Sequence, residues 1–543
     1  MIEVRGIQDF FAEGVQGGWK VQNTGQLKNN QTIECDVVIV GTGAGGGTTA
    51  EILTQAGLDV VLIEEGPLRT SKDFRMEERE AYRDLYQEGA GRTTKDGSMT
   101  ILQGRSVGGS TTVNWTSSFR TPPLTLKHWA DVHGVKGMGV EEMAPWFEQR
   151  EQRLNIAPWQ VPANPNNHVL QAGCEKLGWS WHTIPRNVTG CWNLGYCGMG
   201  CPTNAKQSML VTTIPESLKK GARLYYRARA EKLVVEGKRV TGVYCIGMRE
   251  DGVFSAGVAL TVKARHVVVA GGGINSPGLL LRSGVPDPHR VIGKRTFLHP
   301  VNAVFAQFED NIDPWSGAPQ SIYSDHFQWK DGATGPMGFK LEAIPLHPAL
   351  TASLAGIHGA EHAAFMAQYT HTNGLISLAR DGFTEDSPGG TISLRDEGVP
   401  TVDYPMTDTL RDGLRRAFLA MAEIQFAAGA KAVMPKQLGA KFFSSWSECK
   451  TAIASFQIEK FRTGLGSAHV MGGCSMGEDV KTSVVNSSGR FHQLEGLSVF
   501  DASIFPTSIG ANPQLSIYGV TAKLATHLAN ELKPVGPSAA ATV

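Results

Sequence analysis

Runs of consecutive apolar residues flank a helix-like stretch near the start of the chain. Residues 37–40 read VVIV and residues 59–64 read DVVLIE, and such runs are typical of strands buried on both faces of a sheet. The segment between them has a helix-like pattern that continues to about Ala56. This order of elements predicts a βαβ unit, and therefore an α/β fold for this part of the protein.

Three glycines and one acid stand at the turns of this unit. The first run leads into Gly41-x-Gly43-x-x-Gly46, and the second run ends at Glu64, about 20 residues further on. The first glycine allows a tight turn, the second lets the backbone approach a pyrophosphate, and the third lets helix and strand pack closely. Free N–H groups at the helix start would bind phosphate, and Glu64 would hold ribose hydroxyls. The pattern predicts dinucleotide binding, with FAD and NAD both open and a tightly held flavin favoured.

Later segments predict further strands and a final helix. Residues 227–243 contain two β-rich runs around a Gly-Lys turn, which predicts a hairpin, and residues 265–272 read as a buried strand ending at glycines. Residues 514–532 carry apolar side chains at helical spacing. Asn512 and Pro513 directly precede them, and we expect Asn at the N-cap and Pro at the first helical position.

The overall composition limits the classes of function. A chain of 543 residues is too long for one hydrophobic core, so two or more joined domains are expected. The chain has 51 Lys+Arg and 51 Asp+Glu, and this balance provides no field that attracts nucleic acid or an anionic membrane. No apolar run has the length of a membrane span, and the first residues do not resemble a signal peptide. We therefore expect a cytoplasmic protein.

A histidine and a cysteine stand among glycines in SAHVMGGCSMG, residues 467–477. His469 could be a metal ligand together with Cys474, half of a nucleophilic pair, or a lone acid/base group, and the local sequence does not decide between these. Cys474 has no further ligands at zinc spacing, so it is interpreted as a packing residue, and no metal site is predicted. The eight cysteines of the chain are expected to be mostly reduced and buried.

Three further segments carry recognisable signatures. Residues 104–114 read GRSVGGSTTVN, residues 270–285 read AGGGINSPGLLLRSGV, and residues 498–513 read SVFDASIFPTSIGANP. In their order and spacing, and together with His469, they resemble the glucose–methanol–choline (GMC) oxidoreductases, a family of FAD enzymes. Within that family the chain is similar to long-chain alcohol oxidase or dehydrogenase-like and cholesterol oxidase-like members.

The resemblance implies a division of the chain into two domains. An FAD-binding, Rossmann-like domain would be discontinuous and would comprise residues 1–130, 190–300 and 461–543. A substrate-binding domain would comprise residues 131–189 and 301–460, with an antiparallel sheet over the flavin and helices on its outer face. The expected fold class is α/β, or α+β overall.

The resemblance also implies which residues hold FAD. Ala230 would lie closest to the adenine, and Asp501 and Ala502 would bind the ribityl chain and the pyrophosphate. Backbone and hydroxyl donors near the phosphates and the flavin ring would come from the GGS segment. The full cofactor-binding set is Gly41, Gly43, Gly46, Glu64, Gly104, Gly108, Gly109, Ser110, Asn114, Ala230, Gly271, Asp501, Ala502, Asn512 and Pro513. Covalent attachment in some relatives needs a histidine near this segment, but Thr111 and Thr112 stand there, so noncovalent FAD is expected.

His469 and Asn512 are the catalytic residues that the resemblance implies. Imidazole titrates near neutrality, so His469 would take the hydroxyl proton of an alcohol while hydride passes to flavin N5. Asn512 would hydrogen-bond the substrate oxygen and fix the carbon over N5. The positive end of the following helix would stabilise the charge of reduced flavin. His299 is interpreted as a structural hydrogen-bonding group without a catalytic role.

The substrate and the electron acceptor are less constrained. Asn at position 512, the cysteine-rich segment and the balanced charge favour an apolar alcohol, either long-chain or aromatic, with an aldehyde or ketone as product. The acceptor would be oxygen, a quinone or a cytochrome. A hydroxynitrile-type lyase, a sterol oxidoreductase and a sugar oxidoreductase remain alternatives on the same fold. We expect neither nucleic acid binding nor a transmembrane segment, and peripheral membrane contact stays open.

Two regions keep several interpretations. Cys191, Cys197 and Cys201 could brace a loop, pair in a disulfide or bind a metal, and the lack of a fourth ligand favours loop bracing. Residues 301–460 mix β-like runs with a long amphipathic stretch at 408–430. Aromatic residues in this region could line an apolar pocket, but scattered aromatics more often belong to the core.

Overall fold

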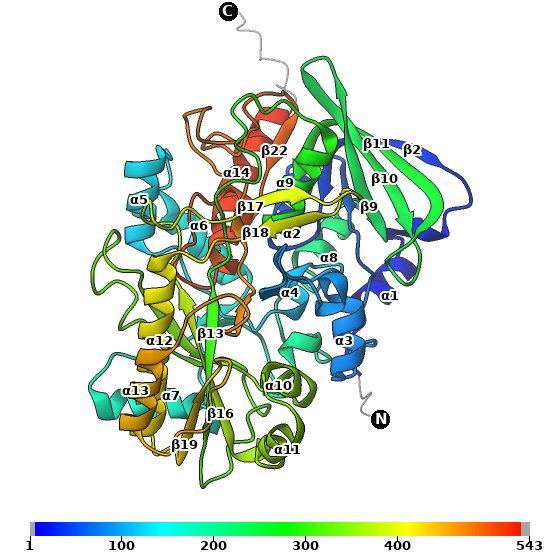
Figure 1. Ribbon diagram of the computed structural model, residues 1–543. Coiled ribbons are helices and arrows are strands. Elements are labelled where there is room, and N and C mark those ends of the chain that lie inside the picture. The colour runs from blue at the N-terminus through cyan, green and yellow to red at the C-terminus, as the bar shows by residue number, and fades with distance from the viewer. Residues whose placement is uncertain (1–5, 534–543) are drawn as a thin grey trace, which may run out of the picture.

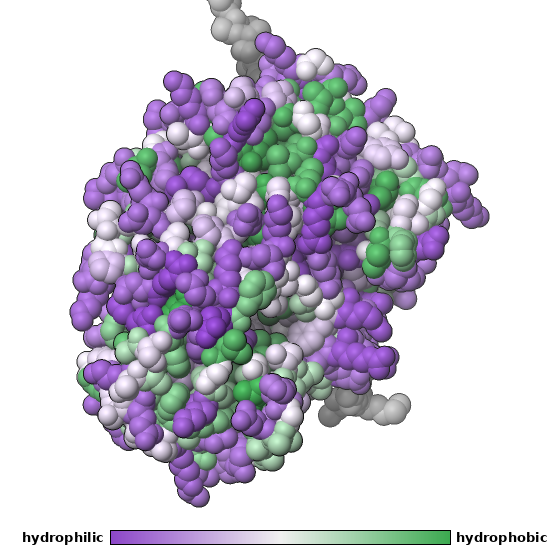
Figure 2. Space-filling model, viewed as in Figure 1, coloured by the Kyte–Doolittle hydropathy of each residue, from purple (hydrophilic) through white to green (hydrophobic). Residues whose placement is uncertain are grey.

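The computed structural model describes residues 6–533, which form two eight-stranded sheets and three two-stranded ones, with helices packed around them (Figure 1). This mixture of helices and strands confirms the expected fold class. No helix within residues 6–533 is both long enough and apolar enough to cross a membrane. The face of the molecule seen in Figure 2 is mostly hydrophilic, with its apolar residues in separate patches.

The first sheet contains the predicted nucleotide-binding unit. Within residues 6–533 its strand order is β1-β8-β3-β2-β11-β10-β9, and β22 pairs with β11. The pairs from β1 to β11, and the pair with β22, are parallel, whereas β10 and β9 are antiparallel. The strands are β1 Lys20–Asn23, β2 Gln31–Val40, β3 Val60–Ile63, β8 Arg223–Tyr226, β9 Ala228–Glu236, β10 Arg239–Met248, β11 Ser255–Val269 and β22 Leu497–Val499. The βαβ unit and the later hairpin are therefore confirmed.

Helix α2 lies at the centre of the packing around this sheet. It follows the glycine-rich turn after β2 and contacts α8 and α14, and α14 in turn packs on α6 (Figure 1). The strands beneath it are fully buried along Val37–Ile39 and Val60–Leu62, as their lack of polar alternation predicts. The helices of this layer are α1 Phe10–Gln16, α2 Ala44–Gln55, α6 Val140–Arg153, α8 Thr213–Lys219, α9 Gly272–Ser283 and α14 Gln514–Leu532.

The second sheet is mostly antiparallel. Its order within the described chain is β4-β20-β13-β16-β15-β14-β6, and β19 pairs with β13. The pair between β4 and β20 is parallel. The strands are β4 Met99–Ile101, β6 His182–Thr183, β13 Val301–Gln307, β14 Ile322–Ser324, β15 Phe339–Ala343, β16 Thr372–Ala379, β19 Ala432–Pro435 and β20 Leu465–Ser467. This sheet is the antiparallel layer expected from residues 301–460, extended by β4, β6 and β20.

The two faces of the second sheet have different partners. Side chains alternate along a strand, so Phe339 and Leu341 of β15 point to one face, where they join a core with residues of α7 and α12. Lys340 and Glu342 point to the opposite face, toward Asn512 and the first sheet. The helices of this layer are α7 Pro165–Leu177, α10 Pro348–Leu354, α11 Gly359–Ala367, α12 Asp408–Ala427 and α13 Trp446–Ser455. Helix α12 confirms the amphipathic stretch predicted at residues 408–430.

Short elements join the two layers. The hairpin of β17 (Thr391–Leu394) and β18 (Pro400–Asp403) belongs to the segment 301–460, yet it packs on α9 of the first layer. The remaining elements are α3 Glu78–Leu85, α4 Ser110–Val113, α5 Pro123–His133, β5 Ile156–Pro158, β7 Pro185–Asn187, β12 Thr296–Phe297 and β21 Met471–Gly472. Strands β4 and β20 come from the expected FAD-binding segments but join the second sheet, whereas the β17–β18 hairpin comes from the expected substrate-binding segment but packs on the first layer. The division into domains therefore stays a prediction.

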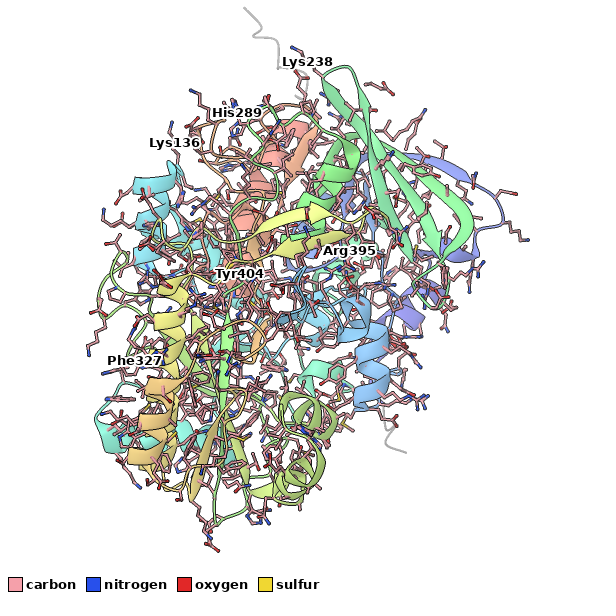
Figure 3. The ribbon with its side chains drawn as sticks, viewed as in Figure 1. Lys136, Lys238, His289, Phe327, Arg395 and Tyr404 are labelled. Carbon is pink, nitrogen blue, oxygen red and sulfur yellow. The ribbon has the colours of Figure 1, made fainter. Side chains whose placement is uncertain are left out.

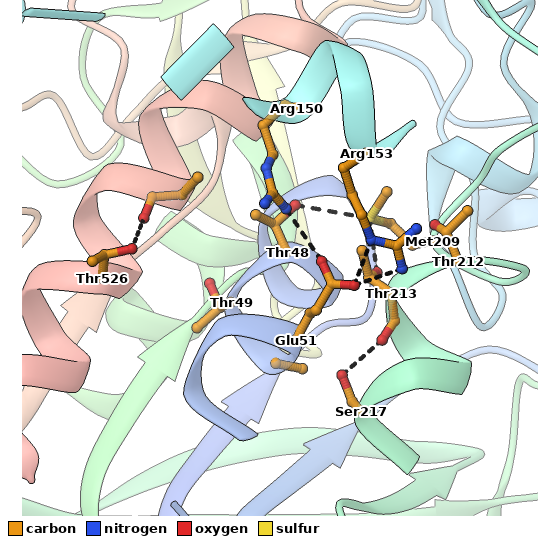
Figure 4. A network of polar contacts seen from close by, with 12 residues as sticks. Thr48, Thr49, Glu51, Arg150, Arg153, Met209, Thr212, Thr213, Ser217 and Thr526 are labelled. Carbon is orange, nitrogen blue, oxygen red and sulfur yellow. Dashed lines mark hydrogen bonds and ion pairs between the residues drawn. The ribbon is translucent and has the colours of Figure 1, made fainter. Parts of the chain in front are cut away.

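A buried ion-pair network fastens α2 to α6 (Figure 4). Arg150 Nη1 donates to Glu51 Oε2 at 3.2 Å, and Arg153 Nε donates to Glu51 Oε1 at 2.7 Å. The side chains of Glu51 and Arg150 are 2% and 6% exposed. Because neither charge reaches bulk water, each depends on the other for its solvation.

Replacing Glu51 with alanine should lower the free energy of unfolding by about 3–5 kcal/mol, because Arg150 would stay buried without a counter-charge. Glu51→Gln should lose less, since one acceptor remains for Arg150. Urea unfolding of both variants beside the wild type, at equal cofactor content, measures the difference. An unchanged midpoint for Glu51→Ala would show that the network contributes nothing to stability.

Candidate functional site

A cavity of about 1010 Å³ lies between the two sheets. Its wall includes most of the predicted cofactor-binding residues, and also His469. Those that line it are Gly41, Gly43, Glu64, Gly104, Gly109, Ser110, Asn114, Ala230, Gly271, Asp501, Ala502, Asn512 and Pro513. Gly46 and Gly108 stand outside this wall. Residues from three distant parts of the chain therefore converge on one cavity.

The glycine-rich turn after β2 has the geometry that its sequence predicts. Gly41 has a φ of +105°, and a Cβ there would collide with the carbonyl of Ala270. A Cβ on Gly46 would collide with the Gly41 carbonyl, so this glycine lets α2 pack closely on the turn. A Cβ on Gly43 would meet only the Cα of Gly109, at 3.8 Å, so Gly43 borders open space. Helix α2 starts directly after Gly43, and its free N–H groups can bind a phosphate there.

Glu64 lies at the end of β3 with a buried carboxylate. Its Oε2 accepts hydrogen bonds from the N–H and the hydroxyl of Thr42, at 3.2 and 2.6 Å, and its Oε1 accepts the N–H of Gly66 at 2.8 Å. Burial raises the pKa of Glu64, and these hydrogen bonds oppose the rise. Oε1 accepts only one of these bonds, so it can still accept a ribose hydroxyl.

The glycine-rich segment after β4 is only partly as predicted. The N–H of Gly104 donates to Ser110 Oγ at 3.0 Å, and Gly109 adopts a positive φ of +53° where it faces Gly43. The expectation that Gly108 offers its N–H to the cofactor is wrong, because that N–H donates to Thr42 Oγ1 at 3.0 Å. Gly108 thus joins two loops behind the cavity, while Gly104, Gly109 and Ser110 border it.

Asp501 connects two of the loops around the cavity. Its Oδ2 accepts from the Gly272 N–H at 2.8 Å and the Ser276 hydroxyl at 2.5 Å, and its Oδ1 accepts from the Ser503 N–H at 2.8 Å. Burial raises the pKa of Asp501, against the effect of these donors. The carboxylate therefore fastens the start of α9 to the turn at Ala502, and both of these line the cavity.

His469 and His299 form a hydrogen-bonded pair at the cavity. Their Nδ1 atoms are 3.1 Å apart, and the rings are tilted by 36°. His469 lines the cavity, whereas His299 is buried and its Nε2 has no partner within the described chain. Burial lowers the pKa of His469 to about 3, and the nearby charge of Lys340 adds to this effect. The imidazole is therefore neutral, and Nε2 can accept a proton when Nδ1–H donates to His299.

The backbone at His299 is strained and held by a buried acid. His299 has a φ of +50°, which side-chain-bearing residues rarely adopt. Asp381 Oδ2 accepts from the N–H groups of Leu298 and His299, at 3.1 and 3.4 Å, and from the hydroxyl of Tyr404 at 2.5 Å. Tyr404 follows the β17–β18 hairpin (Figure 3). Asp381 and the hairpin thus orient His299, which in turn contacts His469.

Asn512 does not cap α14 as the sequence predicts. The N-cap is Pro513, whose carbonyl accepts from Ile517, so the helix begins at Gln514, one residue later than expected. The side chain of Asn512 is thereby free for other contacts. Gln514, the first residue of the helix, accepts a hydrogen bond from Asn114 Nδ2 through its Oε1, at 2.6 Å. Asn512, Pro513 and Gln514 all line the cavity, so the positive end of α14 still points into it.

Two charged residues that the sequence analysis missed hold Asn512 in place. Lys340 Nζ donates to Asn512 Oδ1 at 3.0 Å, and Asn512 Nδ2 donates to Glu342 Oε2 at 3.1 Å. Lys340 and Glu342 form an ion pair at 2.9 Å, with side chains 1% and 0% exposed. The ammonium also lies over the rings of Phe119 and Tyr323. These two charges reach Asn512 from β15 of the second sheet.

The signal for this pair was present in the strand pattern. Phe339, Leu341 and Ala343 alternate with Lys340 and Glu342, so one face of β15 is apolar and the other is charged. Such a pattern is usually read as a core face and a solvent face. Nothing in the sequence indicates that the charged face is covered by the start of α14.

The cysteine-rich segment contains free thiols. All eight cysteines of the chain lie in the described part and are unpaired, and residues 6–533 contain no group of three or more side chains suited to hold a metal. Cys197 is linked to the cavity loop through Lys206, whose ammonium donates to the carbonyls of Thr112, Asn114 and Cys197, at 2.6, 2.9 and 2.7 Å. The segment thus braces the glycine-rich loop through a buried lysine.

The cavity is suited to FAD, the cofactor implied by the family resemblance. Gly43 leaves space at the start of α2, where a side chain would intrude, and Glu64 retains acceptor capacity for ribose. Ala230 and Gly271 border the same cavity, and the start of α14 points its positive end into it. These residues provide sites for adenosine, pyrophosphate and the pyrimidine edge of a flavin.

Comparison with known proteins identifies the family. Residues 82–301 and 386–521 match the N-terminal and C-terminal models of the GMC oxidoreductases. A long-chain-alcohol oxidase of Arabidopsis thaliana is 30% identical over 532 residues, covering 93% of this chain and 69% of that protein. The chain belongs to the GMC oxidoreductase family. The GMC enzyme described here is therefore an oxidoreductase that acts on alcohols, and FAD is its cofactor.

Other relatives agree with this assignment. A GMC-type oxidoreductase of Mycobacterium tuberculosis is 33% identical over 496 residues, covering 90% of this chain and 75% of that protein. The solved structure of a formate oxidase of Aspergillus oryzae superposes with a TM-score of 0.70 at 15% identity, covering 93% of this GMC chain and 100% of that chain. The structural likeness confirms the shared fold.

Replacing Gly43 with valine should leave the fold intact but abolish FAD binding. The φ of Gly43 is −70°, and a Cβ fits beside Gly109, so the protein itself tolerates a side chain that then occupies the phosphate cradle. Flavin absorbance and far-UV circular dichroism of the purified variant measure the two effects separately. Gly17→Ala, at a surface position with a φ of −80°, is the matched control. A Gly43→Val protein with full FAD content would contradict the assignment of this cradle.

Proposed function

We propose that this GMC oxidoreductase oxidises an apolar alcohol to an aldehyde or ketone, with His469 as the proton acceptor and Asn512 as the donor to the substrate oxygen. The observation that carries the proposal is the pairing of a neutral imidazole with a fixed carboxamide on one cavity. His469 has its Nδ1 engaged by His299, and Asn512 is held by Lys340 and Glu342. One ring nitrogen and one N–H therefore remain for a ligand.

The residues of the chain divide the reaction between them. FAD, when bound, supplies the acceptor for the hydride of the alcohol carbon. His469 Nε2 takes the hydroxyl proton, and the charge that develops on the substrate oxygen is stabilised by an N–H of Asn512. The positive end of α14 favours extra negative charge on a group bound beside Pro513. The walls are mainly apolar, so a bound alcohol displaces water from them.

The lining of the cavity supports an apolar substrate. The inner face of the second sheet and helix α10 contribute aliphatic side chains, namely Val301, Ala303, Ile344, Leu350, Leu354 and Ile376. The relative from Arabidopsis thaliana is named a long-chain-alcohol oxidase, in agreement with such a lining. A sugar is a weaker candidate, because it would need polar partners for each hydroxyl.

Several finer points belong to the same proposal. FAD would be noncovalent, because residues 104–114 contain no histidine that could attach it. Oxygen, a quinone or a cytochrome would reoxidise the flavin, and oxygen uptake with substrate separates the first from the others. A cytoplasmic location and peripheral contact with a membrane that supplies the alcohol are both compatible with this reaction.

His469→Ala should retain FAD and lose about 10²–10⁴-fold in the rate of flavin reduction, because the hydroxyl proton loses its acceptor. Anaerobic bleaching of the flavin by primary alcohols of graded chain length measures this rate and ranks the substrates. Wild-type protein that is never bleached would favour the lyase alternative. A His469→Ala rate equal to that of wild type would contradict the assigned role.

The reduction rate should be nearly independent of pH from about pH 5 to pH 7, on account of the low pKa of His469. A base works in its unprotonated form, and a pKa lowered to about 3 keeps this imidazole unprotonated at every pH above that value. Stopped-flow reduction at saturating alcohol over this range provides the profile. A decline below a midpoint of about 6.5, the ordinary value for histidine, would show that the base is not depressed in the holoenzyme.

A further inference from the structure

The face of β15 that points toward the cavity carries two charged side chains. Lys340 and Glu342 are separated by one residue, so both point to the cavity side of the second sheet, beside Ile376 and Leu378 of the neighbouring strand. Each is fully buried, yet only Asn512 among their polar partners lines the cavity. The pair therefore acts on a ligand through Asn512.

We propose that Lys340 and Glu342 are positioning residues that fix the carboxamide of Asn512 with one N–H toward the substrate oxygen. The inference rests on the proposed function and deepens it, because it assigns a role to two residues outside the cavity wall.

The hydrogen bonds determine which way the carboxamide faces. Lysine is a donor only and an ionised carboxylate is an acceptor only, so Asn512 must present its oxygen to Lys340 and its amino group to Glu342. A flipped amide would place N–H against the ammonium and oxygen against the carboxylate. The second N–H of Asn512 is then left for the cavity. Without the pair, either end of the amide could face the substrate, and an oxygen there would repel the developing alkoxide.

Lys340 also polarises the carboxamide. A cation at the oxygen draws electron density away from the nitrogen, which strengthens its N–H groups as donors. Lys340 Nζ makes this contact at 3.0 Å in a fully buried setting, where electrostatic interactions are stronger than in water.

The charge of Lys340 reaches His469 as well. His299, from the segment before β13, contacts His469, and Lys340 of β15 is the charged group that acts on the His469 imidazole. Burial and the Lys340 charge both lower the pKa of His469, and the same two causes act on His299 together with His469 itself. Burial lowers the pKa of Lys340 to about 8, and Glu342 opposes this, so the ammonium remains charged at neutral pH.

A purely structural role predicts something different. Buried ion pairs are seldom more stabilising than apolar residues of the same size, so removal of both charges can leave the fold intact. If the pair only filled space, its replacement would change stability or FAD content and leave the pH dependence of flavin reduction untouched. The pH profile is therefore the readout that separates the two roles.

The test compares anaerobic flavin reduction from pH 3 to pH 9 in FAD-loaded Lys340→Met, Lys340→Arg, Glu342→Gln and the double variant Lys340→Met/Glu342→Gln. Lys481→Met, at an exposed lysine, is the control. Lys340→Met should reduce about 10²-fold more slowly at pH 7, since the amide loses its orientation. The decline of its reduction rate at low pH, here called the acid limb, should also move to higher pH by on the order of 1 pH unit, because the cation near His469 is gone. Lys340→Arg keeps the charge and should keep the wild-type limb.

The other variants make the test independent of any folding failure. Glu342→Gln retains an acceptor for Asn512 and leaves the Lys340 charge unopposed, so its acid limb should stay in place or move downward. The double variant should show an upward limb, with the fold retained. An upward limb in Glu342→Gln, or a wild-type rate and profile in Lys340→Met or the double variant, would overturn the inference. If His469→Ala abolishes flavin reduction while Lys340→Met behaves as wild type, only this inference is contradicted. If the flavin of His469→Ala is reduced at the wild-type rate, the proposed function itself is contradicted.

Discussion

Asn512 stands where the last helix of the first layer meets the inner face of the second sheet. Its carboxamide accepts a hydrogen bond from Lys340 and donates one to Glu342, so a single side chain is held across the boundary between the layers. The rest of the site is arranged around this contact. The start of α14, the His469–His299 pair and the glycine-rich loops all border the same cavity. The geometry that we assign to alcohol oxidation depends on this contact being rigid.

Burying the two charges of this contact has a large free-energy cost. Removing an ion from water costs several kcal/mol, and Lys340 and Glu342 are almost completely buried. Their mutual attraction, the two hydrogen bonds to Asn512 and the aromatic faces around the ammonium offset that cost. The positive charge of Lys340 also disfavours protonation of the histidine. We propose that the same local arrangement provides a fixed donor and an unprotonated base.

The parts of the site that the sequence predicted are those set by short stretches of chain. The turn at Gly41, the acid at Glu64 and the βαβ unit between them follow from steric requirements that act within about 25 residues. The resemblance of the C-terminal segments then led to His469 and Asn512, which line one cavity. The start of α14 was displaced by one residue because the carbonyl of Pro513 itself accepts the first helical hydrogen bond.

The parts that were missed depend on contacts between distant segments. Lys340 and Asn512 are 172 residues apart in the chain, and no local pattern indicates that they meet. The engagement of Gly108 by Thr42 is likewise a contact between separate loops, 66 residues apart. A charged face on β15 is ordinary in a strand that borders solvent, and only the packing of the two layers shows that this face is covered. Sequence reasoning therefore found residues that line one cavity, but not the two charged residues that hold Asn512.

The most direct test of this account is a crystal structure of the FAD-loaded protein with an oxygen-bearing alcohol analogue bound. The account predicts one ligand oxygen within about 3 Å of both His469 Nε2 and Asn512 Nδ2, with the Lys340 and Glu342 contacts intact. An oxygen that reaches neither atom, or an Asn512 whose carbonyl faces the ligand, would contradict it.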